Sequence, residues 1–197
     1  MIGVLLLFAN VYINIKIYPY FISMFINLFD EFGAYGPLFL IFYSIYLLWD
    51  KHNYFFYYIV GLFVNSVLNL ILKGIIQQPR PIEDTKMFNL AMTHGKRFIF
   101  KNGLPYDIFG MPSGHAQACL FSTVFVYLVL RQKNILFIYL IISLITVLQR
   151  ITFNHHTSLQ VFVGSIVGLA FAYFMYCLAK EKIKGKIKEK PDDFGPL

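Results

Sequence analysis

Charged residues are scarce in this sequence, and cysteine is almost absent. Only 14% of the 197 residues are Asp, Glu, Lys or Arg, whereas 58% are hydrophobic. Soluble domains carry about 25% charged residues, so the composition excludes an ordinary soluble fold and predicts an integral membrane protein. The two cysteines, Cys119 and Cys177, both lie inside apolar runs. We therefore expect them to act as small core hydrophobes, because this pattern provides neither a disulfide framework nor a metal site.

Long apolar runs with short polar joints fill most of the chain. A membrane-spanning helix needs about 20 mainly apolar residues. Five runs approach that length, at residues 34–49, 54–72, 114–130, 134–149 and 158–179. They predict an all-α, polytopic membrane bundle in which the uncharged residues 1–15 supply a sixth span, giving about six transmembrane helices.

The N-terminal region differs from these runs. Residues 17–29 reach Asp30 and Glu31 after only 13 positions and are too short to cross alone, so we expect an interfacial segment there. The chain accordingly divides into three parts: an N-terminal span or interfacial segment over 1–33, a transmembrane domain over 34–179, and a basic tail over 180–197.

The positive charge is distributed unevenly. Six Lys and two Glu lie within residues 180–190, so much of the net charge of +7 comes from this tail and does not indicate a nucleic-acid partner. An excess of Lys and Arg marks the cytoplasmic side. With the tail inside, Lys51 and residues 131–133 also lie inside, and the long polar segment 77–112 lies on the opposite face. The tail then serves to fix topology; attraction to anionic lipid, worth about 1 kcal/mol per Lys near the surface, is the alternative.

Three polar clusters adjoin the apolar runs on that opposite face. The first is KGIIQQPRP, residues 73–81. Lys73 ends a span, and the prolines at 79 and 81 disfavour helix at the residues before them, so Arg80 is expected in an extended turn beyond the helix end. Taken alone, the two cations also fit side chains that extend to the membrane surface.

The second cluster, PSGH, opens the span at 114–130. Ser113 is placed to cap the helix, and the amides of Gly114 and His115 have no partner within its first turn. A helix N-terminus with free amides attracts anions, and His115 adds a donor that titrates near neutral pH. Taken alone, the same residues fit a simple helix cap equally well.

The third cluster, QRITFNHHTSLQ, spans residues 149–160. Arg150 closes one span, and two histidines occupy the joint before the next. Gln160 follows His156 by four residues, so the two side chains share a face if the helix has begun. His156 is therefore a candidate nucleophile held by Gln160, whereas His155 has no partner at this spacing. The alternative is that all are polar interface residues of a short hairpin.

Together the clusters supply three cations, a helix N-terminus and two candidate catalytic histidines, His115 and His156. This inventory fits phosphoryl transfer, in which cations and amides stabilise the phosphate oxygens, one histidine attacks, and another protonates the leaving oxygen. The sequence contains no Cys, His and Asp constellation typical of a metal site, so we expect metal-independent chemistry without a cofactor.

The order and spacing of the three clusters resemble the three-part signature of the type 2 phosphatidic acid phosphatase (PAP2) superfamily. The matching elements are Lys73-x6-Arg80-Pro81, residues 112–115, and Arg150-x5-His156, and the resemblance covers about residues 34–179. That superfamily also includes lipid pyrophosphate phosphatases and the soluble vanadium haloperoxidases, the latter being excluded here by the apolar spans. The resemblance implies a six-helix transmembrane catalytic domain with its site at one membrane face.

The resemblance also implies a role for each matching residue. His156 would be the nucleophile that forms a phosphohistidine, and His115 would be the general acid. The phosphate would be held by Lys73, Arg80, Ser113, Gly114 and Arg150.

Two positions depart from the superfamily pattern. Gln149 replaces the usual Ser before the third-motif arginine, and Gln160 replaces the Asp that follows the nucleophilic histidine. A glutamine carbonyl can accept the histidine N–H but brings no charge; in the serine-protease triad, replacing Asp by its amide costs about 10⁴ in rate. We therefore expect either reduced activity or a rebuilt proton relay, for which Asp107 is one conceivable substitute.

These observations support three hypotheses about function. The first is an integral membrane phosphatase that acts on a lipid phosphate or lipid pyrophosphate in the bilayer. The second is a catalytically weakened relative that binds lipid phosphate or serves a partner protein, which Gln160 motivates. The third is a lipid phosphotransferase that passes the phosphoryl group to an acceptor other than water.

Overall fold

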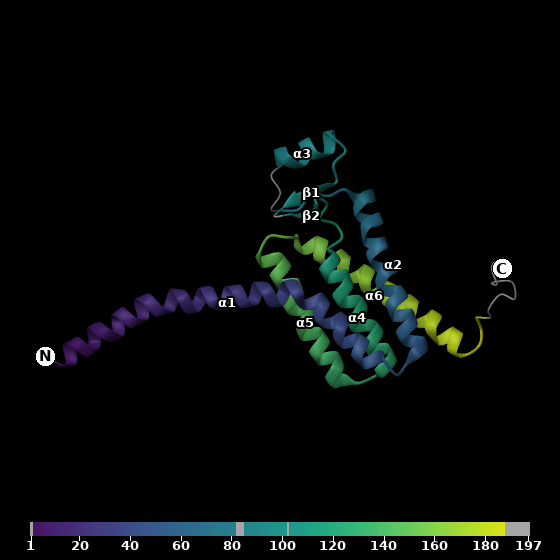
Figure 1. Cartoon of the computed structure of the whole chain (residues 1–197), viewed down its shortest axis with the longest axis horizontal. Helices are drawn as coiled ribbons and strands as arrows, with labels where there is room; N and C mark the ends of the chain where they lie inside the picture. The colour runs from purple at the N-terminus through teal and green to yellow at the C-terminus, as the bar shows by residue number, and fades with distance from the viewer. Residues whose placement is uncertain (1, 82–84, 102, 188–197) are drawn as a thin grey trace.

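The computed structural model describes residues 2–81, 85–101 and 103–187, and it describes side chains from residue 21 onward except those at 87, 101, 104 and 105. The last part of the predicted basic tail, residues 188–197, lies outside the described residues. Within this range the chain forms helices and one small antiparallel hairpin (Figure 1). The elements are α1 (Ile2–Leu48), α2 (His52–Ile76), α3 (Thr85–Thr93), β1 (Phe98–Lys101), β2 (Leu104–Asp107), α4 (Gly114–Leu130), α5 (Lys133–Thr152) and α6 (Ser158–Ile183).

The prediction of an all-α membrane bundle with about six helices is confirmed. Four of the described helical segments are long and apolar enough to cross a membrane: Phe21–Leu48, α2, α5 and α6. The shorter α4 is also apolar and lies at the centre, where it packs against α1, α2, α5 and α6. A helix that is apolar on all sides is expected in such a buried position.

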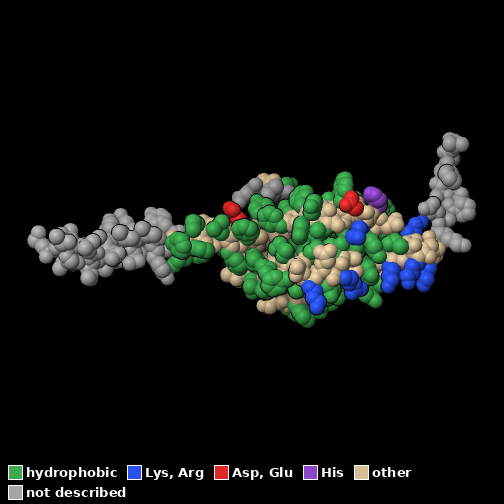
Figure 2. Space-filling model, turned by 90° about the horizontal axis from the view of Figure 1, so that it is seen from below, with side chains coloured by type: hydrophobic (Ala, Val, Ile, Leu, Met, Phe, Trp, Pro, Cys, Tyr) green, Lys and Arg blue, Asp and Glu red, His purple; other side chains and the backbone are tan. Residues whose placement is uncertain are grey.

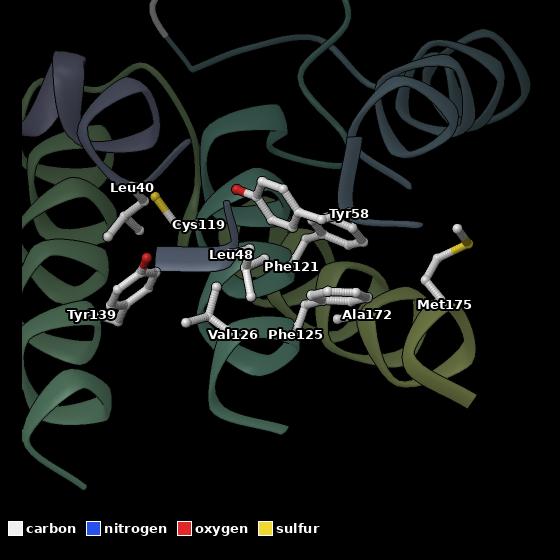
Figure 3. Packing of buried hydrophobic residues seen from close by; sticks show 10 residues of the cluster. All are labelled: Leu40, Leu48, Tyr58, Cys119, Phe121, Phe125, Val126, Tyr139, Ala172 and Met175. Carbon is white, nitrogen blue, oxygen red and sulfur yellow. The ribbon is translucent and has the colours of Figure 1, made fainter. Parts of the chain in front are cut away.

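The central core is built from aromatic side chains that meet around α4. Tyr58 of α2 stacks against Phe121 of α4 at a centroid distance of 5.8 Å, and its hydroxyl bonds with Ser122 at 2.8 Å. Figure 3 shows these rings beside Leu48 of α1 and Tyr139 of α5. The core therefore ties the surrounding helices to α4, whose N-terminal end carries the PSGH motif.

Helix α6 approaches α4 closely because two of its residues lack side chains. A Cβ on Gly164 would overlap the backbone of Ser113, and one on Gly168 would overlap the backbone of Gln117. Small residues spaced four apart permit this kind of close backbone packing between membrane helices. As a result, the start of α4 lies directly against the first turns of α6.

Helix α1 runs without interruption from Ile2 to Leu48, so Asp30 and Glu31, which follow the expected interfacial segment, do not end the helix. The expected interfacial segment at 17–29 is thus part of the same helix as the expected span at 34–49. A helix satisfies its backbone hydrogen bonds internally, so a charged side chain does not end it when that side chain finds a partner. Asp30 has such a partner, since its carboxylate accepts a hydrogen bond from Gln149 of α5.

The described part of the long polar segment, residues 77–81, 85–101 and 103–112, forms a small cap over the bundle end where α2 terminates (Figure 1). Strands β1 and β2 pair antiparallel with Phe98 opposite Asp107. Ala91 of α3 packs with Ile108 and Phe109, which follow β2, in a second small apolar cluster. The cap was predicted only as a polar segment, and its hairpin brings residues 106–109 back to the end of α2.

The α1–α2 and α4–α5 connections lie at the bundle end opposite the cap (Figure 1). Lys51 and Arg131 belong to these connections, and Lys133 is the first residue of α5. Figure 2 views this underside and shows Lys and Arg side chains gathered along one edge of an otherwise largely apolar surface. The described cations of the tail lie in the last turn of α6 or follow it, so the bundle has one end rich in Lys and Arg and another end that carries the cap.

Candidate active site

Arg80 reaches His156 at the capped end of the bundle. Helix α2 ends at Ile76, and Pro79 forms an isolated bridge with Phe109, so Arg80 lies in an extended segment beyond the helix, as the two prolines predict. Its Nη1 lies 3.4 Å from Nε2 of His156, and its Nε donates to the backbone carbonyl of Asp107 at 3.0 Å. The guanidinium also lies 4.5 Å from the centroid of the Tyr106 ring, a cation–π distance.

Gln160 holds the other nitrogen of the His156 ring. The Oε1 atom of Gln160 lies 3.1 Å from Nδ1 of His156 and also accepts the backbone N–H of Thr157 at 3.2 Å. Its Nε2 donates to the carbonyl of Pro79 at 2.9 Å and to Oε1 of Gln78 at 3.0 Å. The backbone partners set the orientation of the amide, because a peptide N–H can only donate and a carbonyl can only accept.

This orientation determines the tautomer of His156. Because Oε1 of Gln160 is an acceptor, Nδ1 of His156 carries the hydrogen, and the lone pair of Nε2 points toward Arg80. The backbone N–H of His156 donates to the carbonyl of Arg150 at 3.1 Å, which anchors the joint between α5 and α6. The ring therefore presents a nucleophilic nitrogen to a cation.

Lys73 lies in the last turn of α2 and points into the cap. Its Nζ donates to the carbonyl of Phe109 at 2.9 Å and lies 3.6 Å from Oδ2 of Asp107. The same carboxylate accepts hydrogen bonds from Nε and Nη2 of Arg97 at 3.3 and 3.0 Å. The hypothesis that Asp107 supplies the carboxylate missing beside His156 is therefore wrong, because the hairpin places the Asp107 side chain against Lys73 and Arg97.

Ser113 occupies the N-cap position of α4, but its side chain makes no capping bond. The expected side-chain cap is wrong in this respect. Its backbone N–H instead donates to the carbonyl of Gln160 at 3.0 Å, and its buried hydroxyl has no hydrogen-bond partner among the described residues. A buried hydroxyl left without a partner costs roughly 1–3 kcal/mol. The hydroxyl and the first amides of α4 are therefore suited to a polar ligand.

The remaining predicted site residues gather around the same point. His115, in the first turn of α4, hydrogen-bonds to the backbone of Ala34 in α1, and it lies within electrostatic range of Arg80 and Arg150. Arg150 ends α5 and is only 8% exposed, and its Nε donates to Oε1 of Gln149. The structure thus brings all the predicted site residues to one end of the bundle.

The pKa of His156 is strongly lowered. Burial is the largest cause, Arg80 adds electrostatic repulsion, and the hydrogen bond to Gln160 opposes the shift, which leaves the pKa at about 3. Burial and the charge of Arg150 also lower the pKa of His155. His156 is therefore a neutral imidazole near pH 7, which is the protonation state a nucleophile requires.

This shift predicts how stability depends on pH. The unfolded chain binds a proton on His156 near pH 6.5 and the folded chain only near pH 3, so the stabilising contribution is complete above 6.5 and decreases as the pH falls toward 3. In detergent, the midpoint of thermal unfolding of the parent should decrease more between about pH 7 and 4.5 than that of a His156→Gln variant. His155 titrates in both proteins and cancels in the comparison. An equal decrease in both would contradict the shift.

An amide ladder that we did not predict supports the site from within the bundle. Nδ2 of Asn69 donates to Oε1 of Gln117 at 2.8 Å and to the carbonyl of Pro112 at 3.2 Å. Nε2 of Gln117 in turn donates to Oδ1 of Asn65 at 2.8 Å. The ladder fixes the PSGH loop against α2. Its signal in the sequence is a pair of asparagines four residues apart within an apolar run, the spacing of one helix face.

The fold and the site define a class: an integral membrane protein of packed apolar helices with a cluster of cations and histidines at one end. A family model described as the PAP2 superfamily matches residues 54–184, which is more than half of the chain. The chain therefore belongs to the PAP2 superfamily, and this membership supports phosphatase activity in general.

A solved structure shares the fold. The chain is similar to the crystal structure of the first transmembrane PAP2-type phosphatidylglycerolphosphate phosphatase from Bacillus subtilis. The match has a TM-score of 0.53 and 18% sequence identity, and it covers 84% of this chain and 79% of the other. A search of curated proteins gave no match.

Proposed function

We propose that this protein is a membrane phosphatase that hydrolyses a lipid phosphate or lipid pyrophosphate through a phosphohistidine on His156. The observation that carries the proposal is the setting of this imidazole: Nδ1 is held by Gln160, and Nε2 lies 3.4 Å from Arg80. A neutral histidine with its lone pair beside a phosphate-binding cation is arranged for attack on phosphorus.

The proposed reaction has two steps. Nε2 of His156 attacks phosphorus and forms an N–P bond while the P–O bond to the lipid breaks, and His115 gives its proton to the leaving oxygen. Water then attacks the phosphohistidine, His115 takes a proton from it, and inorganic phosphate leaves with His156 restored. Charge on the transferring group is stabilised by Lys73, Arg80, Arg150 and the first amides of α4.

In this mechanism a phosphate oxygen must replace the contact between Arg80 and His156. Nη1 of Arg80 lies 3.4 Å from Nε2 of His156, and it must turn onto a phosphate oxygen before Nε2 can attack. Two contacts that involve other atoms, the Nε bond to the Asp107 carbonyl and the ring of Tyr106, can persist during this movement. Arg80 therefore needs only a small rotation to release the nucleophile.

A lipid substrate is supported by the setting of the site. The cations and histidines lie where apolar helices end, so a phosphate headgroup could reach them while its tail stays among the helices' lipid-facing side chains. The positive-inside rule supports the orientation. Lys51, Arg131, Lys133 and the tail then lie in the cytoplasm, and the capped end faces the opposite, extracytoplasmic or lumenal side.

The neutral Gln160 favours a second candidate function, a weakened relative that binds lipid phosphate without rapid turnover. Gln160 accepts the His156 N–H but offers no negative charge to balance an imidazolium that forms in the reaction. Binding at the cations would persist in such a protein, whereas phosphate release would be slow. A lipid phosphotransferase keeps the first step and differs only in the acceptor of the second.

A panel of lipid phosphates tests these functions in one experiment. The purified protein in mixed micelles is expected to release phosphate from at least one lipid monophosphate or pyrophosphate with EDTA present, because Lys73, Arg80 and Arg150 supply the positive charge. Orthovanadate should inhibit the release, since it mimics the transferring phosphoryl group. Binding of the lipids without release would favour the second candidate. Transfer of label to an alcohol instead of water would favour the transferase.

A further inference from the structure

Helix α1 contributes a carboxylate to the neighbourhood of the site. Asp30 accepts a hydrogen bond at Oδ1 from Nε2 of Gln149, and Oε1 of Gln149 accepts one from Nε of Arg150. The three side chains thus form a continuous chain from anion to amide to cation. It connects α1 with the last turn of α5 through two residues, Asp30 and Gln149, that are 119 positions apart in the sequence.

The packing of α1 against α5 leaves space for these three hydrogen-bonded side chains. Gly33 follows Asp30 by three residues and lies on the same face of α1. A Cβ on Gly33 would overlap Cβ and Cγ of Gln149, so the glutamine side chain occupies the space that a larger residue would fill. Gln149 is fully buried as a result. Its amide is therefore held between Asp30 and Arg150.

The amide of Gln149 is polarised at both ends. Its NH₂ group faces a carboxylate and its oxygen faces a guanidinium, so both hydrogen bonds are charge-assisted. Linked bonds of this kind strengthen one another in a buried environment. The series of hydrogen bonds from Asp30 through Gln149 ends on Nε of Arg150. Among the described residues, this guanidinium makes no other hydrogen bond. Nη1 and Nη2 are then left as donors for a ligand.

We propose that Asp30 is a positioning residue that aligns Arg150 for bidentate binding of the substrate phosphate, with Gln149 as the connector. The inference rests on the proposed function, which assigns Arg150 to the phosphate. Arginine binds phosphate best as a fixed, planar fork, and Asp30 holds that fork through its third nitrogen. A serine at position 149, as in the superfamily pattern, is too short to span this distance.

Vanadate binding provides the test, because it reports on the phosphate-binding residues and does not require turnover. Asp30→Asn is expected to weaken orthovanadate binding and raise KM by about 10-fold, with a smaller effect on kcat, because a charge-assisted bond is lost. Asp30→Glu should restore most of the affinity. Glu31→Gln is the matched control: Glu31 is the adjacent, exposed carboxylate of the same helix and its replacement should change neither value.

A double-mutant cycle separates positioning from general packing. On a Gln149→Leu background, which breaks the connector, Asp30→Asn should have little further effect on vanadate affinity. An undiminished effect there would overturn the proposal. So would an Asp30→Asn protein that unfolds at a lower temperature yet binds vanadate like the parent, since Asp30 would then serve stability alone.

Failure of the inference differs from failure of the proposed function. If the parent binds vanadate and Asp30→Asn weakens it, the positioning role holds even if no lipid is hydrolysed. If Arg150→Ala binds vanadate as tightly as the parent, Arg150 is not a phosphate ligand and the inference falls while hydrolysis can still be observed. A parent that binds no vanadate overturns both.

Discussion

Replacement of His156 by alanine is expected to lower phosphate release by about 10⁴-fold or more, because it removes the nucleophile of a covalent mechanism. The imidazole is buried and both of its ring nitrogens have partners. No other described side chain is therefore placed to substitute for it. The rate should be measured on the lipid that the parent cleaves best. After acid-free quenching, labelled phosphate should remain on the parent protein and be absent from the variant.

The adjacent histidine provides the matched control. His155 is partly exposed, and its backbone N–H also donates to the carbonyl of Arg150. His155→Ala should alter the rate by less than about 10-fold. Equal turnover by His156→Ala and the parent would contradict the mechanism. A reversed order, in which His155→Ala loses most activity, would show that His155 and not His156 is the nucleophile.

Replacement of Gln160 by leucine is expected to lower the rate by about 10³-fold. The acceptor for Nδ1 of His156 disappears, so the ring is free to adopt the tautomer that places the hydrogen on Nε2, and loss of this kind of orientation costs about 10⁴ in the serine-protease triad. Leucine has a similar volume, so the core around position 160 keeps its packing. Vanadate affinity should change much less than kcat, because Lys73, Arg80 and Arg150 remain.

Replacement of Gln160 by aspartate distinguishes a weakened relay from a rebuilt one. We expect no large gain in rate, because Nε2 of Gln160 also donates to Pro79 and Gln78 and a shorter carboxylate loses both contacts. A gain above about 10-fold would instead show that the natural relay is weak for lack of charge. If neither the parent nor this variant releases phosphate while both bind vanadate, the lipid-binding candidate is favoured.

The membrane class and the three clusters could be predicted from the sequence because each depends on local chemistry. Apolar runs of membrane-spanning length follow from side-chain hydrophobicity, and the prolines at 79 and 81 restrict their neighbours directly. The candidate site residues were likewise proposed from residue type and spacing. The sequence separated residues 17–29 from the span at 34–49, whereas α1 runs through both, because a local pattern does not show whether a charge in an apolar helix has a partner elsewhere.

Partners that lie far apart in the chain could not be predicted in this way. The proximity of Asp107 to Lys73 and Arg97 depends on a hairpin between them, and Asp30 meets Gln149 across more than 100 residues. The role of Ser113 also changed, because close packing of α6 turned its backbone toward Gln160 and left the hydroxyl without a partner in the part of the chain that the structure describes.

By itself, the sequence predicted the membrane bundle and identified the candidate residues for phosphoryl transfer, because hydrophobicity and side-chain chemistry belong to each residue. Only the tertiary structure decided which nitrogen of His156 carries the hydrogen, since that depends on how Pro79 and Thr157 orient the Gln160 amide. It likewise decided that α1 connects to Arg150. Hydrogen bonds depend on direction and distance, and these arise only when the helices pack.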